Sequence, residues 1–207
     1  MDFIHYIQNS LSLPLPGERS HREMLSAQRM KELNTFTHIS PPVNSAVLIM
    51  LYKKNNEWYI PFIKRAIDNH IHSGQIALPG GKVEPSDKNL QMTALRETFE
   101  EIGIPQEDIA ILGELTPLYI PPSNYQVYPF IGYCSNPNPI FKPDNKEVHH
   151  IIHIPVKQFS EPGIRQDRDF NVKQLHFSSP CFEIENDVIW GATAMIINEF
   201  LALSEIK

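Results

Sequence analysis

The feature that most constrains the fold of this chain is an amphipathic pattern over residues 92–104. Ser86 and Asp87 provide a signal for a helix start, whereas Gly103 and Pro105 provide a stop. Apolar side chains recur between these signals with the spacing of one helical face, at Met92, Leu95, Phe99 and Ile102. The pattern therefore predicts a helix with one side packed against a core.

Three carboxylates share the opposite side of this helix. At about 100° per residue, Glu97, Glu100 and Glu101 fall within an arc of about 100°. Each pair of like charges three or four residues apart costs about 0.2–0.5 kcal/mol, and the two carboxylates in the last turn also oppose the helix dipole. The cluster is either a solvated acidic face or a site for a divalent cation such as Mg²⁺, which prefers oxygen ligands.

Segments typical of strands lie on both sides of the helix. A buried strand is expected at 45–53, a turn at 55–56 and a second strand at 57–65, and a short strand ends in the Pro79-Gly80-Gly81 turn. Further strands are expected at 109–115, 126–134 and 148–154, and other helices at 2–9, after 11–25 and at 190–204. Together they predict an α/β class with a mixed (α+β) sheet covered on two sides.

Length and composition limit what the chain can do. Its 207 residues predict a single domain over 1–207, with a helical and loop extension at 1–44 and a core at 45–207 that ends in the C-terminal helix. A net charge of −6 argues against nucleic-acid binding, and the longest apolar run, at 46–52, is too short to span a membrane. Without a signal-peptide pattern or a disulfide framework, a cytoplasmic location is expected.

From residue 81 the chain reads GKVEPSDKNLQMTALRETFEEIGI, which resembles the Nudix box, the glycine–helix signature of the Nudix hydrolases. The common form has Glu where Asp87 stands, an aliphatic residue where Thr98 stands, and one residue fewer before Arg96. The second half of the box, R-E-x-x-E-E-x-G-I, is intact from Arg96 to Ile104. The resemblance favours a metal site over a solvated acidic face.

Residues 64–81, KRAIDNHIHSGQIALPGG, resemble the signature R-[S/A]-x-x-x-R-x-x-x-G-x-x-x-F-P-G-G of the coenzyme A pyrophosphatase branch. His70 replaces the second Arg and Leu78 replaces the Phe. Because histidine is charged only part of the time near pH 7, phosphate binding at His70 is expected to be weaker or pH-dependent. The segments 13–25, 117–132 and 189–197 also resemble this branch, so the resemblance covers most of the chain.

The resemblance implies an α/β/α Nudix sandwich that uses Mg²⁺ or Mn²⁺ to hydrolyse a diphosphate. From coenzyme A the products would be 4′-phosphopantetheine and adenosine 3′,5′-bisphosphate. Carried over position by position, Glu97 and Glu101 are the primary metal ligands, and Glu100 is a further ligand, direct or through water. Arg96 is expected to serve catalysis by holding a carboxylate in place with its rigid guanidinium.

Other candidate residues lie outside the acidic helix. Gly80 and Gly81 would let the backbone bend sharply and approach the metal and the substrate. Glu147 is the candidate general base or an additional metal ligand, with an edge-strand charge as the alternative. Tyr125 lies in a stiff, proline-rich loop that either lines the ligand pocket or only packs against the fold. Basic residues near the box are candidates for the ligand's phosphates, with plain surface charge as the alternative: Lys64, Arg65, His70, His72 and Lys82.

Several alternatives remain open at this point. His149, His150 and His153 suggest zinc, but on a strand His150 would face away from the other two. The substrate could be another nucleoside diphosphate derivative, such as ADP-ribose or NADH. The domain could also be a ligand-sensing module without catalysis, although such a module would be expected to have lost one of the glutamates. A homodimer is compatible with the sequence, which does not determine the oligomeric state.

Overall fold

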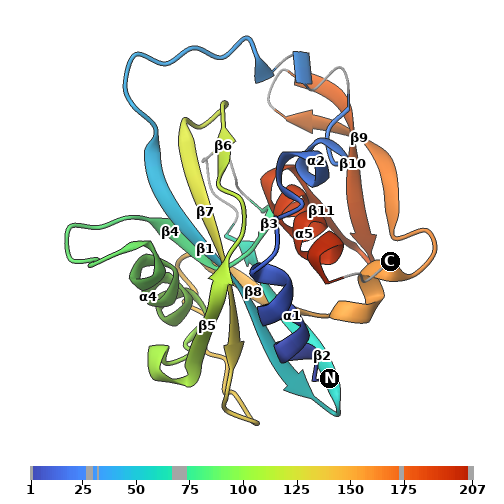
Figure 1. Ribbon diagram of the computed structural model, residues 1–207. Helices are drawn as coiled ribbons and strands as arrows, with labels where there is room; N and C mark the ends of the chain where they lie inside the picture. Colours follow the sequence, from blue (N-terminus) through green and yellow to red (C-terminus); the bar gives the residue numbers. More distant parts are fainter. Residues whose placement is uncertain (1, 27–29, 32, 67–73, 173–174, 205–207) are drawn as a thin grey trace.

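We describe the protein from a computed structural model, which covers residues 2–26, 30–31, 33–66, 74–172 and 175–204. Its centre is a mixed sheet in which β1 (Val43–Lys54) runs parallel to β7 (Tyr125–Cys134) and antiparallel to β2 (Glu57–Arg65) (Figure 1). The strand order is β3-β2-β1-β7-β5, with β4 also paired to β1, β6 to β7 and β8 to β2. The remaining bounds are β3 Ile76–Ala77, β4 Gly80–Lys82, β5 Ile109–Glu114, β6 Leu118–Ile120 and β8 Val148–Pro155.

Strands β1 and β2 form a tight hairpin. Asn55 and Asn56 connect β1 to β2 and both have positive φ, of 50° and 63°. Two consecutive residues in the left-handed region match the right-handed twist of the flanking strands, and asparagine tolerates this conformation. The predicted turn at 55–56 is confirmed.

Helices cover both faces of the main sheet. Alternate residues of β1 point to opposite sides: Leu48 packs on the face covered by α4 (Leu90–Ile102), and Ile49 packs on the face covered by α1 (Phe3–Leu11) and α5 (Gly191–Leu203). Figure 1 shows α4 on one side of β1 and β7, and α1 and α5 on the other. The predicted α/β/α sandwich is confirmed. No helix in the described part of the chain is long and apolar enough to cross a membrane.

The helix predicted from the acidic pattern exists, and Leu95 and Ile102 of its predicted apolar face are buried in the core, but its start and the positions of Phe99 and Glu101 were predicted wrongly. Its N-cap is Asn89, whose side chain accepts a hydrogen bond from the backbone N–H of Met92. Phe99 is 51% exposed, whereas Thr98 and Glu101 are buried. The helix turns its small residues, Ala94 and Thr98, towards the core, which allows close approach to the sheet. Glu101 is thereby carried into the interior.

A second sheet follows the last strand that was expected from the sequence. It has the order β11-β10-β9, with bounds β9 Arg165–Val172, β10 Leu175–Ile184 and β11 Asp187–Trp190. These strands were not predicted, because β9 is rich in charged residues and β10 contains a proline at position 180, so neither shows a clear alternation of apolar and polar residues. The Lys64 ammonium group ties this sheet to β2 through an ion pair with Asp187 at 2.9 Å.

The N-terminal segment is anchored by a fully buried carboxylate. Glu199 of α5 has an exposed fraction of 0% and accepts hydrogen bonds from the backbone N–H of Gly17, His21 Nε2, and the N–H and hydroxyl of Thr116. These contacts join α2 (Gly17–Arg22), α5 and the connection after β5. Burial raises the pKa of Glu199, but the hydrogen bonds from His21 and Thr116 outweigh it and hold the pKa below its usual value.

The Glu199→Ala variant is expected to lose about 3–5 kcal/mol of unfolding free energy, because its partners would stay buried without an acceptor. For a chain of this size that is a fall in Tm of about 10 °C, measurable by thermal unfolding. Since the pKa of Glu199 is lowered, the full difference is expected above pH 4.5, the value for the unfolded chain, and it shrinks as the pH falls through the folded value. Glu114→Ala, at an exposed site, is the matched control; equal losses in both variants would refute this role.

Candidate active site

Two glycines bring the backbone against the acidic helix. Strand β4 pairs with β1, and Gly80 has φ of +154°. A Cβ at Gly80 would lie 2.3 Å from the Ala46 carbonyl oxygen, and a Cβ at Gly81 would lie 2.4 Å from Glu97 Oε1. At Gly80 a side chain would clash with the backbone of β1, whereas at Gly81 it would clash with the flexible Glu97 side chain, whose carboxylate lies directly against the Gly81 backbone.

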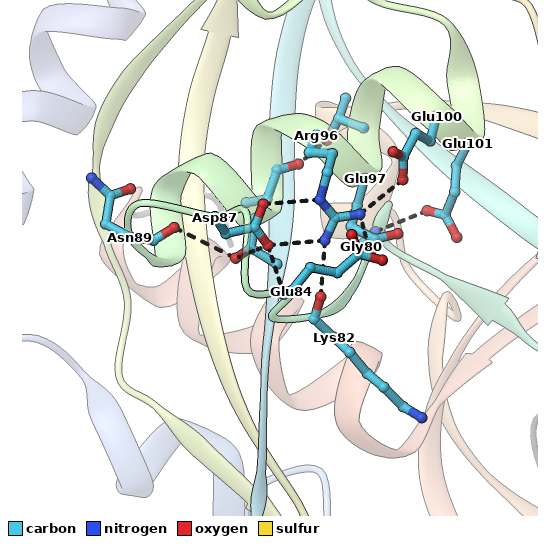
Figure 2. Close-up of polar contacts among 12 residues, drawn as sticks. Gly80, Lys82, Glu84, Asp87, Asn89, Arg96, Glu97, Glu100 and Glu101 are labelled. Atoms are coloured by element: carbon cyan, nitrogen blue, oxygen red, sulfur yellow. Dashed lines mark hydrogen bonds and ion pairs between the residues drawn. The ribbon is translucent and has the colours of Figure 1, made fainter.

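Glu101 is the most deeply placed carboxylate of the helix, with an exposed fraction of 2%. Its Oε2 accepts a hydrogen bond from the Gly80 N–H at 2.8 Å (Figure 2). Its Oε1 lies 3.8 Å from Arg65 Nη1. Burial raises the pKa of Glu101 to about 8, an effect that the Gly80 hydrogen bond and the Arg65 charge only partly offset. The nearby charges of Glu97 and Glu147 add to the rise.

Arg96 connects most of the acidic residues of the site (Figure 2). Its guanidinium binds Asp87 through two hydrogen bonds of 2.9 and 3.0 Å, and its Nη1 donates to Glu97 at 2.9 Å and to Glu100 at 2.8 Å. A further bond reaches the Lys82 carbonyl at 2.9 Å. The Arg96 hydrogen bonds hold the pKa of Asp87 near 2. Asp87, which departs from the common motif, thus keeps the arginine in place from the loop before the helix.

The pKa of Glu97 is influenced by several charged neighbours. Burial raises its pKa above the usual value, Arg96 opposes the rise, and the charges of Glu100 and Glu147 add to it. Glu147 begins the approach to β8, where its carbonyl oxygen accepts a hydrogen bond from the Ala66 N–H at 2.9 Å. The electrostatic effect of Glu147 on both Glu97 and Glu101 follows from its position beside the helix.

The donors at this site suit a hard divalent cation. Glu97 and Glu101 supply carboxylate oxygens, and their raised pKa values reflect negative charge held at low exposure, which a cation would relieve. Within the described ranges, no three acidic, histidine or cysteine side chains already surround a metal position; Arg96 Nη1 bonds to both Glu97 and Glu100 instead. The carboxylates present are therefore ligands of the kind that Mg²⁺ or Mn²⁺ prefers.

A cleft with a volume of about 1220 Å³ opens beside the carboxylates. It is large enough for a nucleotide derivative. Predicted site residues that line it are Arg65, Gly80, Gly81, Arg96, Glu97, Glu100, Glu101, Tyr125 and Glu147, together with the phosphate candidate Lys82. Lys64 does not line it, because its ammonium group is paired with Asp187. His70 and His72 lie outside the described residues.

Some lining residues were missed in the sequence. They come from the strap before β1 (Phe36, His38, Ser40), from the second sheet (Phe177, Trp190) and from the start of α5. Trp190 and the start of α5 fall in the segment 189–197, whose resemblance assigns no role, and the other missed residues lie outside that segment. The three histidines of β8 do not form a zinc site in the described part of the chain: His153 bonds to the Tyr52 hydroxyl at 2.7 Å, whereas His149 and His150 contact each other.

Comparisons with known proteins agree with this geometry. The NUDIX domain family matches residues 42–174. Relatives from Yersinia pestis and Yersinia pseudotuberculosis, each named an uncharacterized Nudix hydrolase NudL, are 36% identical over 183 residues, which is 87% of this chain and 90% of theirs. A MutT/nudix family protein from Enterococcus faecalis has a TM-score of 0.53 at 16% identity, covering 91% of this chain and 74% of that one. A MutT protein from Methanosarcina mazei has a TM-score of 0.51 at 16% identity, covering 83% of this chain and 100% of that one.

The chain belongs to the Nudix family. It is a Nudix hydrolase, an enzyme of the class that hydrolyses nucleoside diphosphate derivatives and generally uses divalent metal ions. Residues 1–41, most of the predicted extension over 1–44, precede the matched region, and the treatment of this extension as part of one domain stays a prediction.

The Glu101→Gln variant is expected to resist alkaline destabilisation in the presence of a chelator. The folded pKa of about 8 exceeds the unfolded value of 4.5, so the stability of the parent protein falls as the pH rises from 4.5 through 8, while a neutral glutamine is unaffected. The Tm of the variant, measured relative to the parent by thermal unfolding, should therefore increase by several degrees between pH 5 and pH 8. Glu100→Gln, whose side chain is 52% exposed, is the control. A Tm difference between variant and parent that stays constant with pH would contradict the raised pKa of Glu101.

Proposed function

We propose that this enzyme hydrolyses the diphosphate of coenzyme A or its derivatives to 4′-phosphopantetheine and adenosine 3′,5′-bisphosphate. The observation that carries the proposal is the meeting of Glu97 and Glu101 with the Gly80–Gly81 backbone in a large cleft beside Arg65. The choice of coenzyme A within the family rests on the resemblance of residues 64–81 to the branch signature. A cytoplasmic location and a homodimer remain predictions.

In the proposed mechanism, Glu97 and Glu101 would hold Mg²⁺ or Mn²⁺, and Glu100 would be a further ligand, direct or through water. The ion would screen the diphosphate oxygens and lower the pKa of the attacking water. Glu147 accepts a proton from the attacking water. The water oxygen bonds to one phosphorus atom of the diphosphate, and the bond from that phosphorus to the bridging oxygen breaks. Arg96 acts as a positioning residue, because its guanidinium is bound to Asp87, Glu97 and Glu100.

Residues of the cleft wall would bind the rest of the substrate. Arg65 and Lys82 are the cationic side chains proposed to contact phosphate oxygens, and His70 would contribute according to its charge. The Lys82 ammonium group lies 5.8 Å from the centre of the Tyr125 ring, so both side chains face one region of the cleft. A role for Lys64 in binding phosphate has less support because of its pairing with Asp187.

A substrate comparison tests the proposal. The purified protein is incubated with coenzyme A, ADP-ribose or NADH in the presence of Mg²⁺ or Mn²⁺, and products are identified by chromatography and mass. We expect the highest kcat/KM for coenzyme A, with adenosine 3′,5′-bisphosphate as a product. An equal or higher kcat/KM for ADP-ribose or NADH would refute the choice of substrate and leave the Nudix chemistry. Binding of a dinucleotide without turnover of any compound would favour the ligand-sensing alternative.

A further inference from the structure

The wall of the cleft formed by the second sheet and α5 has no part in the chemistry proposed above. Phe177 of β10, Trp190 at the end of β11 and Ala192 in the first turn of α5 all line the cleft that also contains the glutamates. Figure 1 shows the second sheet and α4 on opposite sides of β1 and β7. The cleft therefore has a carboxylate-rich wall on α4 and an apolar, aromatic wall on the second sheet and the start of α5.

A smaller cavity of about 60 Å³ continues from the apolar wall. It shares six lining residues with the cleft: Ile120, Pro122, Phe177, Trp190, Gly191 and Ala192. Its other walls include Leu25, Leu33, Leu118 and Met195, and no charged side chain of the described residues lines it. An apolar extension of this kind excludes a phosphate or a sugar and suits an aliphatic chain.

A third aromatic ring packs against Phe177 and Trp190 of this wall. The Phe170 ring stacks on Trp190 with centroids 4.6 Å apart and on Phe177 with centroids 5.9 Å apart. Phe170 itself lines neither cavity within the described residues. A wall fixed in this way loses little side-chain freedom when an apolar group packs on it.

We propose that Phe177, Trp190 and Ala192 form a subsite for an aliphatic chain carried by the substrate beyond its diphosphate, with the chain end entering the smaller cavity. The inference rests on the proposed function: in a coenzyme A derivative, this chain is an acyl group on the pantetheine arm. Each methylene that leaves water contributes a factor of about four in affinity. Acylated coenzyme A is therefore the better substrate, and the second sheet and the start of α5 determine the preference.

The first test compares octanoyl-coenzyme A with free coenzyme A. For the parent enzyme, we expect kcat/KM to be at least about tenfold higher for the octanoyl form. Ala192 lines both cavities, so Ala192→Leu adds bulk where they share a wall and should reduce this ratio to near one. Ala202→Leu makes the same substitution on the exposed side of α5 and should leave the ratio as in the parent. A ratio near one in the parent, or equal ratios in parent and Ala192→Leu, would overturn the inference.

The second test detects chain binding without relying on turnover. The chain has two tryptophans, and Trp58 packs against Phe3 and Tyr133 and lines neither cavity, so Trp58→Phe leaves Trp190 as the single tryptophan, which is excited selectively over the tyrosines. On rapid mixing with 8-bromooctanoyl-coenzyme A and Mg²⁺, the bromine should quench Trp190 before hydrolysis. Adding Ala192→Leu should remove the quenching, while coenzyme A without the chain should cause none.

The two tests separate this inference from the proposed function. Hydrolysis of both compounds with equal kcat/KM and no quenching would overturn the chain subsite and leave coenzyme A as the substrate. Quenching that Ala192→Leu removes, without hydrolysis of either compound, would support the subsite and refute the proposed activity. The absence of both quenching and hydrolysis would refute both.

Discussion

Replacing Glu97 by glutamine is expected to lower kcat/KM for coenzyme A by at least about 10³-fold, because a bound cation supplies several kcal/mol of transition-state stabilisation and each 1.36 kcal/mol is a factor of ten. Glutamine preserves the shape of the side chain and can still accept a hydrogen bond from Arg96, but it carries no negative charge to hold the ion. The loss is measured by steady-state kinetics at saturating Mg²⁺, alongside thermal unfolding to verify the fold.

The control for this variant is Glu107→Gln, which changes an exposed glutamate that does not line the cleft. It should keep the kcat/KM of the parent. If Glu97→Gln retained more than a tenth of the parent activity with the same dependence on Mg²⁺, Glu97 would not be a primary metal ligand.

The second large effect is expected from Gly81→Ala, which adds a single methyl group. The new Cβ would fall 2.4 Å from Glu97 Oε1, so the flexible carboxylate must move away. A displacement of about 1 Å at a reacting centre can cost about 10²-fold in rate, and we expect a loss of that size in kcat/KM with little change in Tm.

Gly163→Ala should give the opposite result. Gly163 has φ of +87° and no atoms within 4 Å of a built Cβ, so alanine there strains the backbone without touching the site. Its Tm should fall while kcat/KM stays unchanged. If Gly81→Ala kept full activity, the contact between the Glu97 carboxylate and the Gly81 backbone would not matter for catalysis.

Much of the fold could be predicted because local patterns agree with the tertiary packing. The β1–β2 hairpin follows from β-branched and aromatic runs around two asparagines, and α4 follows from apolar spacing and a terminal glycine. The buried face of α4 could not be predicted from hydrophobicity alone. Its packing depends on the size of Ala94 and Thr98 and on the Gly80 N–H, which gives the buried Glu101 a hydrogen-bond donor.

The acidic part of the candidate site follows from spacing along one helix, whereas the rest depends on contacts between distant segments. Lys64 is close to the box in the sequence, yet its ammonium group forms an ion pair with Asp187 of the second sheet. Trp190 and Phe177 reach the cleft only because that sheet folds back on the main one. Neither contact has a local signal, since both depend on which distant strands lie together.

The measurement that tests the account most directly is the rate of adenosine 3′,5′-bisphosphate release from coenzyme A as Mg²⁺ is titrated into chelator-treated protein. We predict no release without the ion and a saturable rise with it, abolished in the Glu97→Gln and Glu101→Gln variants. Release that is unaffected by the chelator, or that persists in both variants, would contradict the assignment of this acidic helix as the metal-binding centre of the enzyme.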